Sequence, residues 1–230
     1  MEIGIEILPD CLSLWQESEK TMNETDTLQS APVVGISRHR LTTDGEGVTT
    51  LVVFHGCPLR CKFCLNPHTL SPETIQPVYD TQLLYDEVKI DELYFLATKG
   101  GITFGGGEPC LRSKFIEEFR QLCGEAWTLN VETSLNVPHS HLERLLPVIN
   151  EYIVDIKDMN PDIYQTYTGK DNKQSLSNLQ WLVEQGKAEH IMVRIPHIPH
   201  FNTQEDIALS VERLKEMGLS RFDLFTYRTY

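Results

Sequence analysis

The sequence predicts an α/β fold, a partial (β/α)6 barrel of the TIM type with parallel strands inside and helices outside. Two observations predict it. Six short apolar segments alternate with about five segments of helical periodicity, which is the pattern of successive βαβ units. Polar or reactive residues follow each predicted strand, at the edge where parallel α/β folds bind their ligands. Six units are too few to close an eight-stranded barrel.

The strands are expected where short runs are apolar and rich in β-branched residues. The first run, VTTLVVF at 48–54, has the composition of a buried strand, and the second is stopped by the glycines that begin at Gly105. The predicted strands cover residues 48–54, 101–104, 127–131, 152–156, 190–195 and 222–227.

The helices are expected where apolar residues recur at helical spacing. In the third helix this face is formed by Leu142, Leu145 and Ile149. Gly186 and Gly218 follow the last two helices, as is usual at helix C-termini. The predicted helices cover residues 78–98, 111–123, 139–150, 176–185 and 203–217.

Composition limits the classes of protein that this chain can form. Its 230 residues are 40% hydrophobic, enough for one large domain, which we expect over 31–230 after a polar, poorly ordered extension over 1–30. The net charge of −13 argues against binding a nucleic-acid backbone. The sequence has no apolar run long enough for a membrane span and no basic secretory start, so we predict a cytoplasmic protein.

A cluster of three cysteines follows the first predicted strand. Cys57, Cys61 and Cys64 have the spacing C-x3-C-x2-C, which in a cytosolic chain is more typical of a metal site than of disulfides. Zinc would take a fourth ligand, for which His55 or His68 is available. An iron–sulfur cluster held by three thiolates would leave one iron open to another ligand. Spacing alone leaves both interpretations open.

The later strands end in charged residues that an apolar strand would place in the barrel. Asp155 and Lys157 alternate with apolar neighbours, so both should point inward, where an ion pair is costly unless it binds a ligand. The same argument applies to Arg194, and Glu132 directly follows the third strand. The glycines at 105–107 form either a plain turn or a close approach of backbone to a ligand.

These motifs resemble those of the radical S-adenosylmethionine (SAM) enzymes. The cysteine motif, with the aromatic Phe63 before its third cysteine, is similar to their signature, and the run GGEP at 106–109 is similar to their second motif. Three further runs resemble the subgroup that activates glycyl-radical enzymes: 44–48 (DGEGV), 155–159 (DIKDM) and 194–202 (RIPHIPHFN). The similarity covers roughly residues 33–228.

The resemblance implies a cofactor for each group of residues. Cys57, Cys61 and Cys64 would hold a [4Fe–4S] cluster whose open iron chelates SAM. The SAM site would be formed by Phe63, Asn66, Gly106, Gly107, Glu108, Glu132, Thr133, Asp155, Lys157 and Arg194. Within it, Glu132, Thr133 and Asp155 match the ligands of a monovalent cation. Lys157, Arg194 and Arg228 would be the catalytic residues.

The implied reaction is reductive cleavage of SAM to a 5′-deoxyadenosyl radical, which takes a hydrogen from a glycine of a partner glycyl-radical enzyme. A flavodoxin or ferredoxin would supply the electron. The chain departs from the subgroup at Glu132, usually Asp, and at Leu65 and Arg228, where histidine is expected. Two alternatives remain: a radical SAM enzyme acting on a small molecule or peptide, and a non-catalytic iron–sulfur or zinc module.

Overall fold

The computed structural model describes residues 28–41, 43–71 and 76–227. Within these ranges the chain forms a sheet of eight strands in the order β3-β1-β2-β4-β5-β6-β7-β8. Six of them run parallel from β2 to β8 and confirm the predicted partial barrel: β2 (Val48–Phe54), β4 (Gly101–Gly106), β5 (Thr128–Thr133), β6 (Glu151–Asp155), β7 (Ile191–His197) and β8 (Arg221–Thr226).

Two further strands extend the sheet at its β2 edge, and the sequence analysis missed both. Strand β1 (Ser30–Leu41) pairs antiparallel with β2, and β3 (Val78–Asp80) pairs antiparallel with β1. Register shifts interrupt the pairing of β1 with β2, and His39 has a positive φ of 56°. These irregularities remove the strict alternation by which a strand is recognised.

The single helix expected over 78–98 was wrong, because that segment contains a short strand, two helices and a 3-10 turn between them. After β3, Asp80 ends the strand and accepts a hydrogen bond from the Leu83 amide (2.7 Å), which starts α2 (Thr81–Val88). A 3-10 turn, η2 (Lys89–Asp91), then leads into α3 (Glu92–Thr98). The apolar spacing that predicted one helix therefore comes from two short helices, α2 and α3, in succession.

The other predicted helices are present: α4 (Ser113–Cys123), α5 (His139–Leu145), α7 (Lys173–Glu184) and α8 (Gln204–Glu216). The sequence analysis missed α6 (Pro161–Thr168), although it has ordinary boundary signals. Its Asn160 side chain accepts from the Asp162 amide, Pro161 is the first helical residue and Gly169 ends the helix with a φ of +77°. Three short 3-10 turns complete the elements: η1 (Pro67–Leu70), η3 (Pro109–Arg112) and η4 (Ala188–His190).

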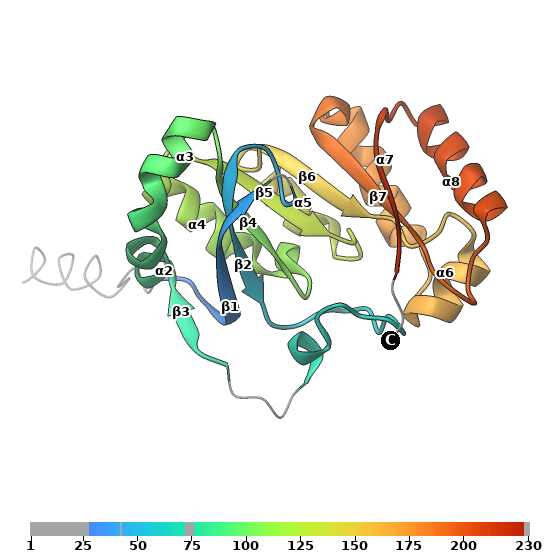
Figure 1. Cartoon of the computed structure of the whole chain (residues 1–230), viewed down its shortest axis with the longest axis horizontal. Helices are drawn as coiled ribbons and strands as arrows, with labels where there is room; N and C mark the ends of the chain where they lie inside the picture. The colour runs from blue at the N-terminus through green and yellow to red at the C-terminus, as the bar shows by residue number, and fades with distance from the viewer. Residues whose placement is uncertain (1–27, 42, 72–75, 228–230) are drawn as a thin grey trace, which may run out of the picture.

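The two faces of the sheet differ in character, which places the site. Residues such as Val52, Phe54 and Phe104 are fully buried and belong to the main core, where the Phe54 and Phe104 rings stack 5.6 Å apart. In Figure 1, α2, α3 and α4 lie near the β3 end of the sheet, and α6, α7 and α8 lie near the β8 end. Since side chains alternate along a strand, the polar residues Asn130 and Glu132 of β5 face away from the core neighbours Leu129 and Val131.

None of the helices within the described ranges is long and apolar enough to cross a membrane. The extension predicted over 1–30 falls almost wholly outside the described residues, as does the predicted catalytic residue Arg228. Both therefore stay predictions.

Candidate active site

One cavity at the carboxyl ends of the parallel strands collects most of the predicted site. Its lining includes the three cysteines of the motif, which follow β2, and polar groups from the ends of β4, β5, β6 and β8. These are Cys57, Cys61, Cys64, Asn66, Gly106, Gly107, Glu132, Thr133, Ser134, Asp155, Lys157 and Tyr227. Residues as far apart as Cys57 and Tyr227 meet here because parallel strands end at one edge.

The loop that carries the cysteines is held by backbone hydrogen bonds from two directions. The Gly56 amide donates to the Thr69 carbonyl (2.9 Å), which closes the loop on itself. The Arg60 and Lys62 amides donate to the carbonyls of Thr168 (2.8 Å) and Tyr167 (3.1 Å) at the end of α6. Helix α6, which the sequence analysis missed, therefore fixes the cysteine loop.

The three thiols suit a cationic metal centre. All are free and half-buried, and burial raises the pKa of Cys57 to about 12 and that of Cys61 above its usual value. Thiols with raised pKa values stay neutral at pH 7 unless a cation stabilises the thiolate, which bound iron or zinc does. The donor set therefore fits a cluster that bonds three thiolates.

A single zinc ion and a multi-iron cluster place different demands on the donor groups. In the described ranges, no three His, Cys, Asp or Glu side chains gather closely enough to hold one ion. The His55 ring, one candidate fourth zinc ligand, has its Nε2 2.9 Å from the Ser71 carbonyl. A cubane cluster does not require its thiolates to meet at one point, because each bonds a different iron.

The glycines after β4 bring two backbone segments into contact. The Gly107 amide donates to the Phe54 carbonyl (3.0 Å), and the Glu108 amide donates to the Gly56 carbonyl (2.8 Å). A Cβ on Gly107 would overlap the Gly56 carbonyl, and Gly106 has a φ of +96°. The glycines therefore permit a close approach of backbone to backbone, while the approach of this run to a ligand stays a prediction. The Asn66 amide also donates to the Gly106 carbonyl (3.3 Å).

Glu108 is fully buried and does not line the cavity. Its carboxylate accepts from the Thr133 hydroxyl (2.6 Å) and from the amide (2.9 Å) and hydroxyl (2.6 Å) of Ser134. The Cys110 amide donates to it as well (3.2 Å). Glu108 therefore joins the end of β4 to the end of β5, and we propose for it a positioning role in place of direct contact with SAM.

Asp155 and Lys157 form the charged floor of the cavity. The buried Lys157 ammonium lies 2.8 Å from an Asp155 oxygen and 3.1 Å from the Tyr227 hydroxyl. Burial lowers the pKa of Lys157, but Asp155, together with Tyr227 and Cys61, more than offsets this and raises the pKa well above its usual value, so the side chain is charged. The other Asp155 oxygen, Oδ1, is buried and has no partner among the described residues, which suits an acceptor for a ligand's hydroxyl or ammonium.

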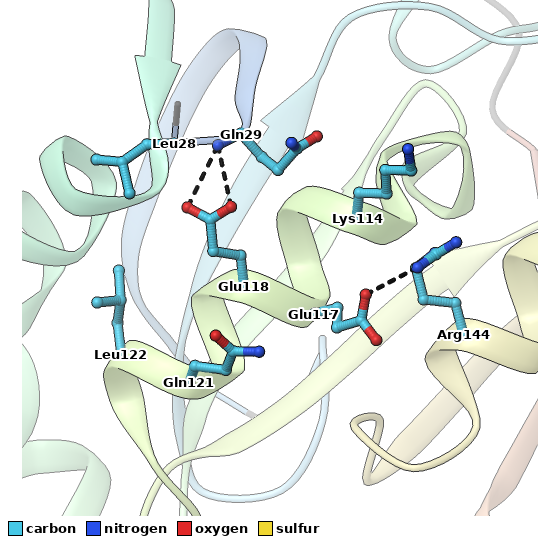
Figure 2. Close-up of a pocket in the computed structure, with 8 residues that line it drawn as sticks. All are labelled: Leu28, Gln29, Lys114, Glu117, Glu118, Gln121, Leu122 and Arg144. Carbon is cyan, nitrogen blue, oxygen red and sulfur yellow. Dashed lines mark hydrogen bonds and ion pairs between the residues drawn. The ribbon is translucent and has the colours of Figure 1, made fainter. Parts of the chain in front are cut away.

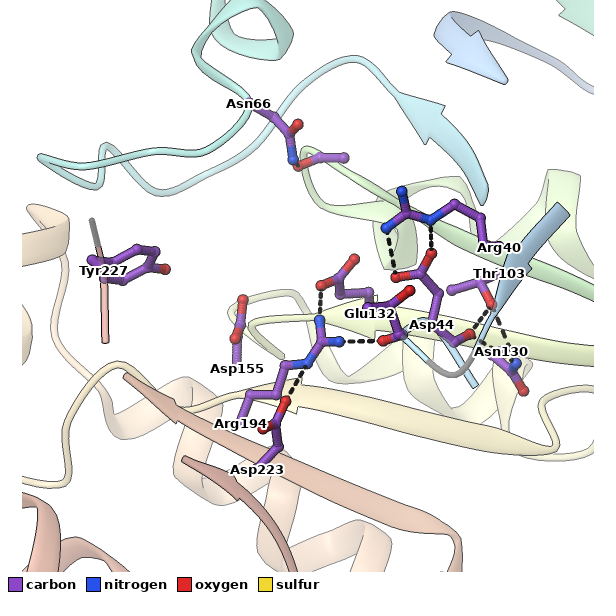
Figure 3. Close-up of polar contacts among 12 residues, drawn as sticks. Arg40, Asp44, Asn66, Thr103, Asn130, Glu132, Asp155, Arg194, Asp223 and Tyr227 are labelled. Carbon is purple, nitrogen blue, oxygen red and sulfur yellow. Dashed lines mark hydrogen bonds and ion pairs between the residues drawn. The ribbon is translucent and has the colours of Figure 1, made fainter. Parts of the chain in front are cut away.

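Glu132 and Arg194 form an ion pair next to this floor (Figure 3). Arg194 also donates to the Thr43 carbonyl and lies 3.3 Å from Asp223. Arg194 does not line the cavity itself. The carboxylates of the predicted cation site therefore both have cationic partners from the chain, Arg194 for Glu132 and Lys157 for Asp155; the monovalent cation stays a prediction.

The loop before β2 contacts the inner face of the sheet near Glu132. Asp44 is buried and pairs with Arg40. Its backbone carbonyl accepts from the Thr103 hydroxyl and from the Asn130 side-chain amide (3.3 Å), as Figure 3 shows. The DGEG turn signal in the sequence thus marks a loop that reaches into the half-barrel.

Glu132 should make the stability of the SAM-free protein depend on pH. Burial and the neighbouring Asp155 raise the pKa of Glu132 from its ordinary 4.5 to about 7, while Arg194 opposes the shift. Between pH 4.5 and about 7, the folded state then binds more protons than the unfolded state. The free energy of unfolding therefore falls as pH rises through this range. We expect Glu132→Gln to flatten this decline in urea unfolding measured at several pH values. The exposed control Glu125→Gln should leave the decline unchanged; equal profiles for the wild type and Glu132→Gln would contradict the assignment.

Tyr227 and Ser134 are among the lining residues that were not predicted. Tyr227, at the end of β8, lines the cavity and contacts Lys157, whereas the sequence analysis chose its neighbour Arg228. Ser134 holds Glu108. Phe63 packs away from the cavity lining, against Phe201 (ring centroids 5.8 Å apart). The only sequence signal for Tyr227 is its position at the end of the last predicted strand.

A second pocket lies on the outer surface of α4 (Figure 2), and none of the three cysteines lines it. Three of its four charged side chains have partners: Glu118 accepts from the Gln29 amide (3.0 Å), and Glu117 lies 3.0 Å from Arg144. No reactive group converges there, so the candidate site is the cavity beside the cysteines.

Comparisons with known proteins show the family to which the chain belongs. Residues 51–214, well over half of the chain, match the family model described as the radical SAM superfamily. The pyruvate formate-lyase-activating enzyme of Listeria monocytogenes is 30% identical over 82% of this chain and 78% of that relative. The (2S)-3-sulfopropanediol dehydratase activating enzyme of Klebsiella oxytoca is 28% identical over 76% of this chain and 74% of that relative.

The solved structures support the fold. SuiB of Streptococcus suis, in its crystal structure bound to SAM, superposes with a TM-score of 0.59. The match covers 76% of this chain and 39% of SuiB, at 18% sequence identity.

Proposed function

This chain belongs to the radical SAM superfamily and, within it, to the enzymes that activate glycyl-radical enzymes, and from that premise we propose that it cleaves SAM reductively at a [4Fe–4S] cluster. The resulting 5′-deoxyadenosyl radical would take a hydrogen atom from a glycine of a partner glycyl-radical enzyme. The observation that carries the proposal is the shared cavity: three free thiols and the Asp155–Lys157 pair line the same space.

The cluster and SAM supply the radical chemistry, and the chain's own residues hold and orient them. Cys57, Cys61 and Cys64 are the cluster ligands in this proposal. The Asp155 oxygen without a partner would accept from SAM, and the Lys157 ammonium is placed to pair with its carboxylate. A monovalent cation at Glu132 and Thr133 would belong to the same end of SAM.

The surroundings of the cysteine loop would restrict water near the reactive centre. Phe63, Tyr167 and Phe201 form a cluster of aromatic rings behind Cys61, with centroids 5.2 to 6.3 Å apart. Tyr227 extends this cluster toward Lys157, with the Nζ atom 5.8 Å from its ring centroid. An apolar wall of this kind protects a radical from side reactions with solvent.

The proposal is tested by anaerobic reconstitution with iron and sulfide, reduction with dithionite and addition of SAM. We expect 5′-deoxyadenosine to form, measured by liquid chromatography, and a glycyl radical to appear in electron paramagnetic resonance when a glycyl-radical enzyme is supplied. If 5′-deoxyadenosine forms but no tested glycyl-radical enzyme gains a radical, the partner class is wrong. If zinc binds and no cluster assembles, the function itself is wrong.

Lys157 should contribute to SAM binding and not to cluster assembly. Lys157→Met keeps much of the buried side-chain volume but leaves Asp155 without its cation at 2.8 Å. We expect SAM affinity, measured by calorimetry on the reconstituted protein, to fall at least about tenfold, the 1.4 kcal/mol or more that one lost charged hydrogen bond contributes. The visible spectrum of the cluster should not change. Unchanged affinity would remove Lys157 from the SAM site, and the exposed Lys173→Met is the matched control.

A further inference from the structure

Three exposed cationic residues surround the outside of the cysteine loop. Arg60 and Lys62 lie between the cysteines, and Lys170 follows the end of α6. The two segments are in contact: the Arg60 amide donates to Thr168, and a Cβ at Gly169 would lie 4.0 Å from the Arg60 Cβ. We refer to Arg60, Lys62 and Lys170 as the basic rim.

The charges of the basic rim are not neutralised by the described parts of the chain. None of the ion pairs within the described residues involves Arg60, Lys62 or Lys170. The next acid along the chain, Asp171, accepts from the Lys173 amide (3.0 Å). The Arg60 guanidinium donates to backbone carbonyls only, those of Cys57 (2.6 Å) and Leu59 (2.8 Å). The rim is therefore a local positive area on a protein of net charge −13.

The basic rim lies next to the cluster ligands but outside the cavity. The Arg60 guanidinium donates a hydrogen bond to the Cys57 carbonyl, and Lys62 directly follows Cys61 in the sequence. None of the three rim residues lines the cavity. A hydrogen donor must reach the reactive carbon inside the cavity. An electron can instead enter through the loop that holds the cluster, so a partner on the rim need not compete with substrate.

We propose that the basic rim is the docking surface for an acidic electron-carrier protein that reduces the cluster. This inference rests on the proposed function, which consumes one electron for each SAM cleaved. A carrier such as a flavodoxin would give one electron from its flavin hydroquinone, which becomes the semiquinone, while the cluster goes from the 2+ to the 1+ state. An acidic carrier is repelled by most of this chain, and opposite local charge both steers and orients its approach.

The test compares two variants of the full chain with equal changes in charge. Lys62→Glu/Lys170→Glu reverses two rim charges, and Lys114→Glu/Lys215→Glu reverses two exposed charges on α4 and α8. At low salt, we expect reduction of the cluster by flavodoxin hydroquinone to slow at least about tenfold in the rim variant. The control should stay within about twofold of wild type, and added salt should narrow the difference. Stopped-flow absorbance measures the rate.

Two further measurements separate the rim from the active site. With dithionite as reductant, wild type and both variants should form 5′-deoxyadenosine equally. Flavodoxin should also bind the cluster-free rim variant more weakly than cluster-free wild type, measured by calorimetry. This binding measurement tests the rim even if wild type forms no 5′-deoxyadenosine and the proposed function fails.

Three outcomes would overturn the inference. The rim variant could bind flavodoxin and accept its electron as wild type does, which would exclude the rim as the docking surface. The rim variant could lose 5′-deoxyadenosine formation with dithionite, which would place the rim in the SAM site. It could instead form 5′-deoxyadenosine with dithionite but fail to transfer the radical, which would show that the rim binds the glycyl-radical enzyme.

Discussion

Cys61→Ala is expected to abolish cluster assembly and, with it, all 5′-deoxyadenosine formation. Three thiolates fix three irons of the cluster and leave the fourth open, so the loss of Cys61 leaves a second iron without a protein ligand. Cys61 also lies between the aromatic cluster and Lys157, where burial raises its thiol pKa and Lys157 opposes that shift. The variant should contain little iron and sulfide after anaerobic reconstitution and show no cluster absorbance.

Cys123→Ala is the matched control for this loss. Cys123 is a buried thiol at the end of α4, its sulfur 3.8 Å from the Arg120 carbonyl, and it has no place in the cavity. Its replacement should leave iron content and 5′-deoxyadenosine yield unchanged. A Cys61→Ala protein with the iron content of wild type would disprove the ligand assignment, whatever its activity.

The parallel part of the fold could be predicted because its strands are short runs rich in apolar and β-branched residues. Strand β2 shows this, since its VTTLVVF run needs no tertiary information to be recognised. Strand β1 could not be found in the same way. Its bulges and the left-handed His39 break the alternation, and its pairing with β2 stabilises it despite the unfavourable pattern.

The site could be predicted where a single strand carries the signal. Asp155 and Lys157 alternate with apolar neighbours, and the structure places both in the cavity as that alternation requires. The ion pair of Glu132 with Arg194 depends on β5 and β7, which β6 separates. The register of the strands and the curvature of the barrel determine which side chains meet across two strands. Neither property can be predicted from a local sequence pattern.

The role of Glu108 shows the same limit. The GGEP run predicts that this residue belongs to the site, but the partners of its carboxylate, Thr133 and Ser134, lie on another strand and in the loop after it. Only the pairing of β4 with β5 brings them together. These contacts support our proposal that Glu108 positions the residues that line the cavity.

Glu108→Ala should be strongly destabilising. It removes the acceptor of the buried Ser134 amide, which has no freedom to turn toward another partner, and of two hydroxyls. A buried donor left without an acceptor costs about 1–3 kcal/mol, and the hydroxyls can rotate, so we expect a total loss of about 3 kcal/mol in the free energy of unfolding. Urea unfolding of the cluster-free protein measures this directly.

The isosteric variant and a surface control make the result specific. Glu108→Gln keeps the side-chain volume but turns one acceptor into a donor that faces the Ser134 amide, so it should lose about half as much stability. Glu117→Ala breaks the half-exposed pair with Arg144 and should cost less than about 1 kcal/mol. Both Glu108 variants should also weaken SAM binding, since Thr133 and Ser134 line the cavity. If Glu108→Ala unfolds at the same urea concentration as Glu117→Ala, the network is not what joins β4 to β5, and the glycine contacts with the cysteine loop must hold the site alone.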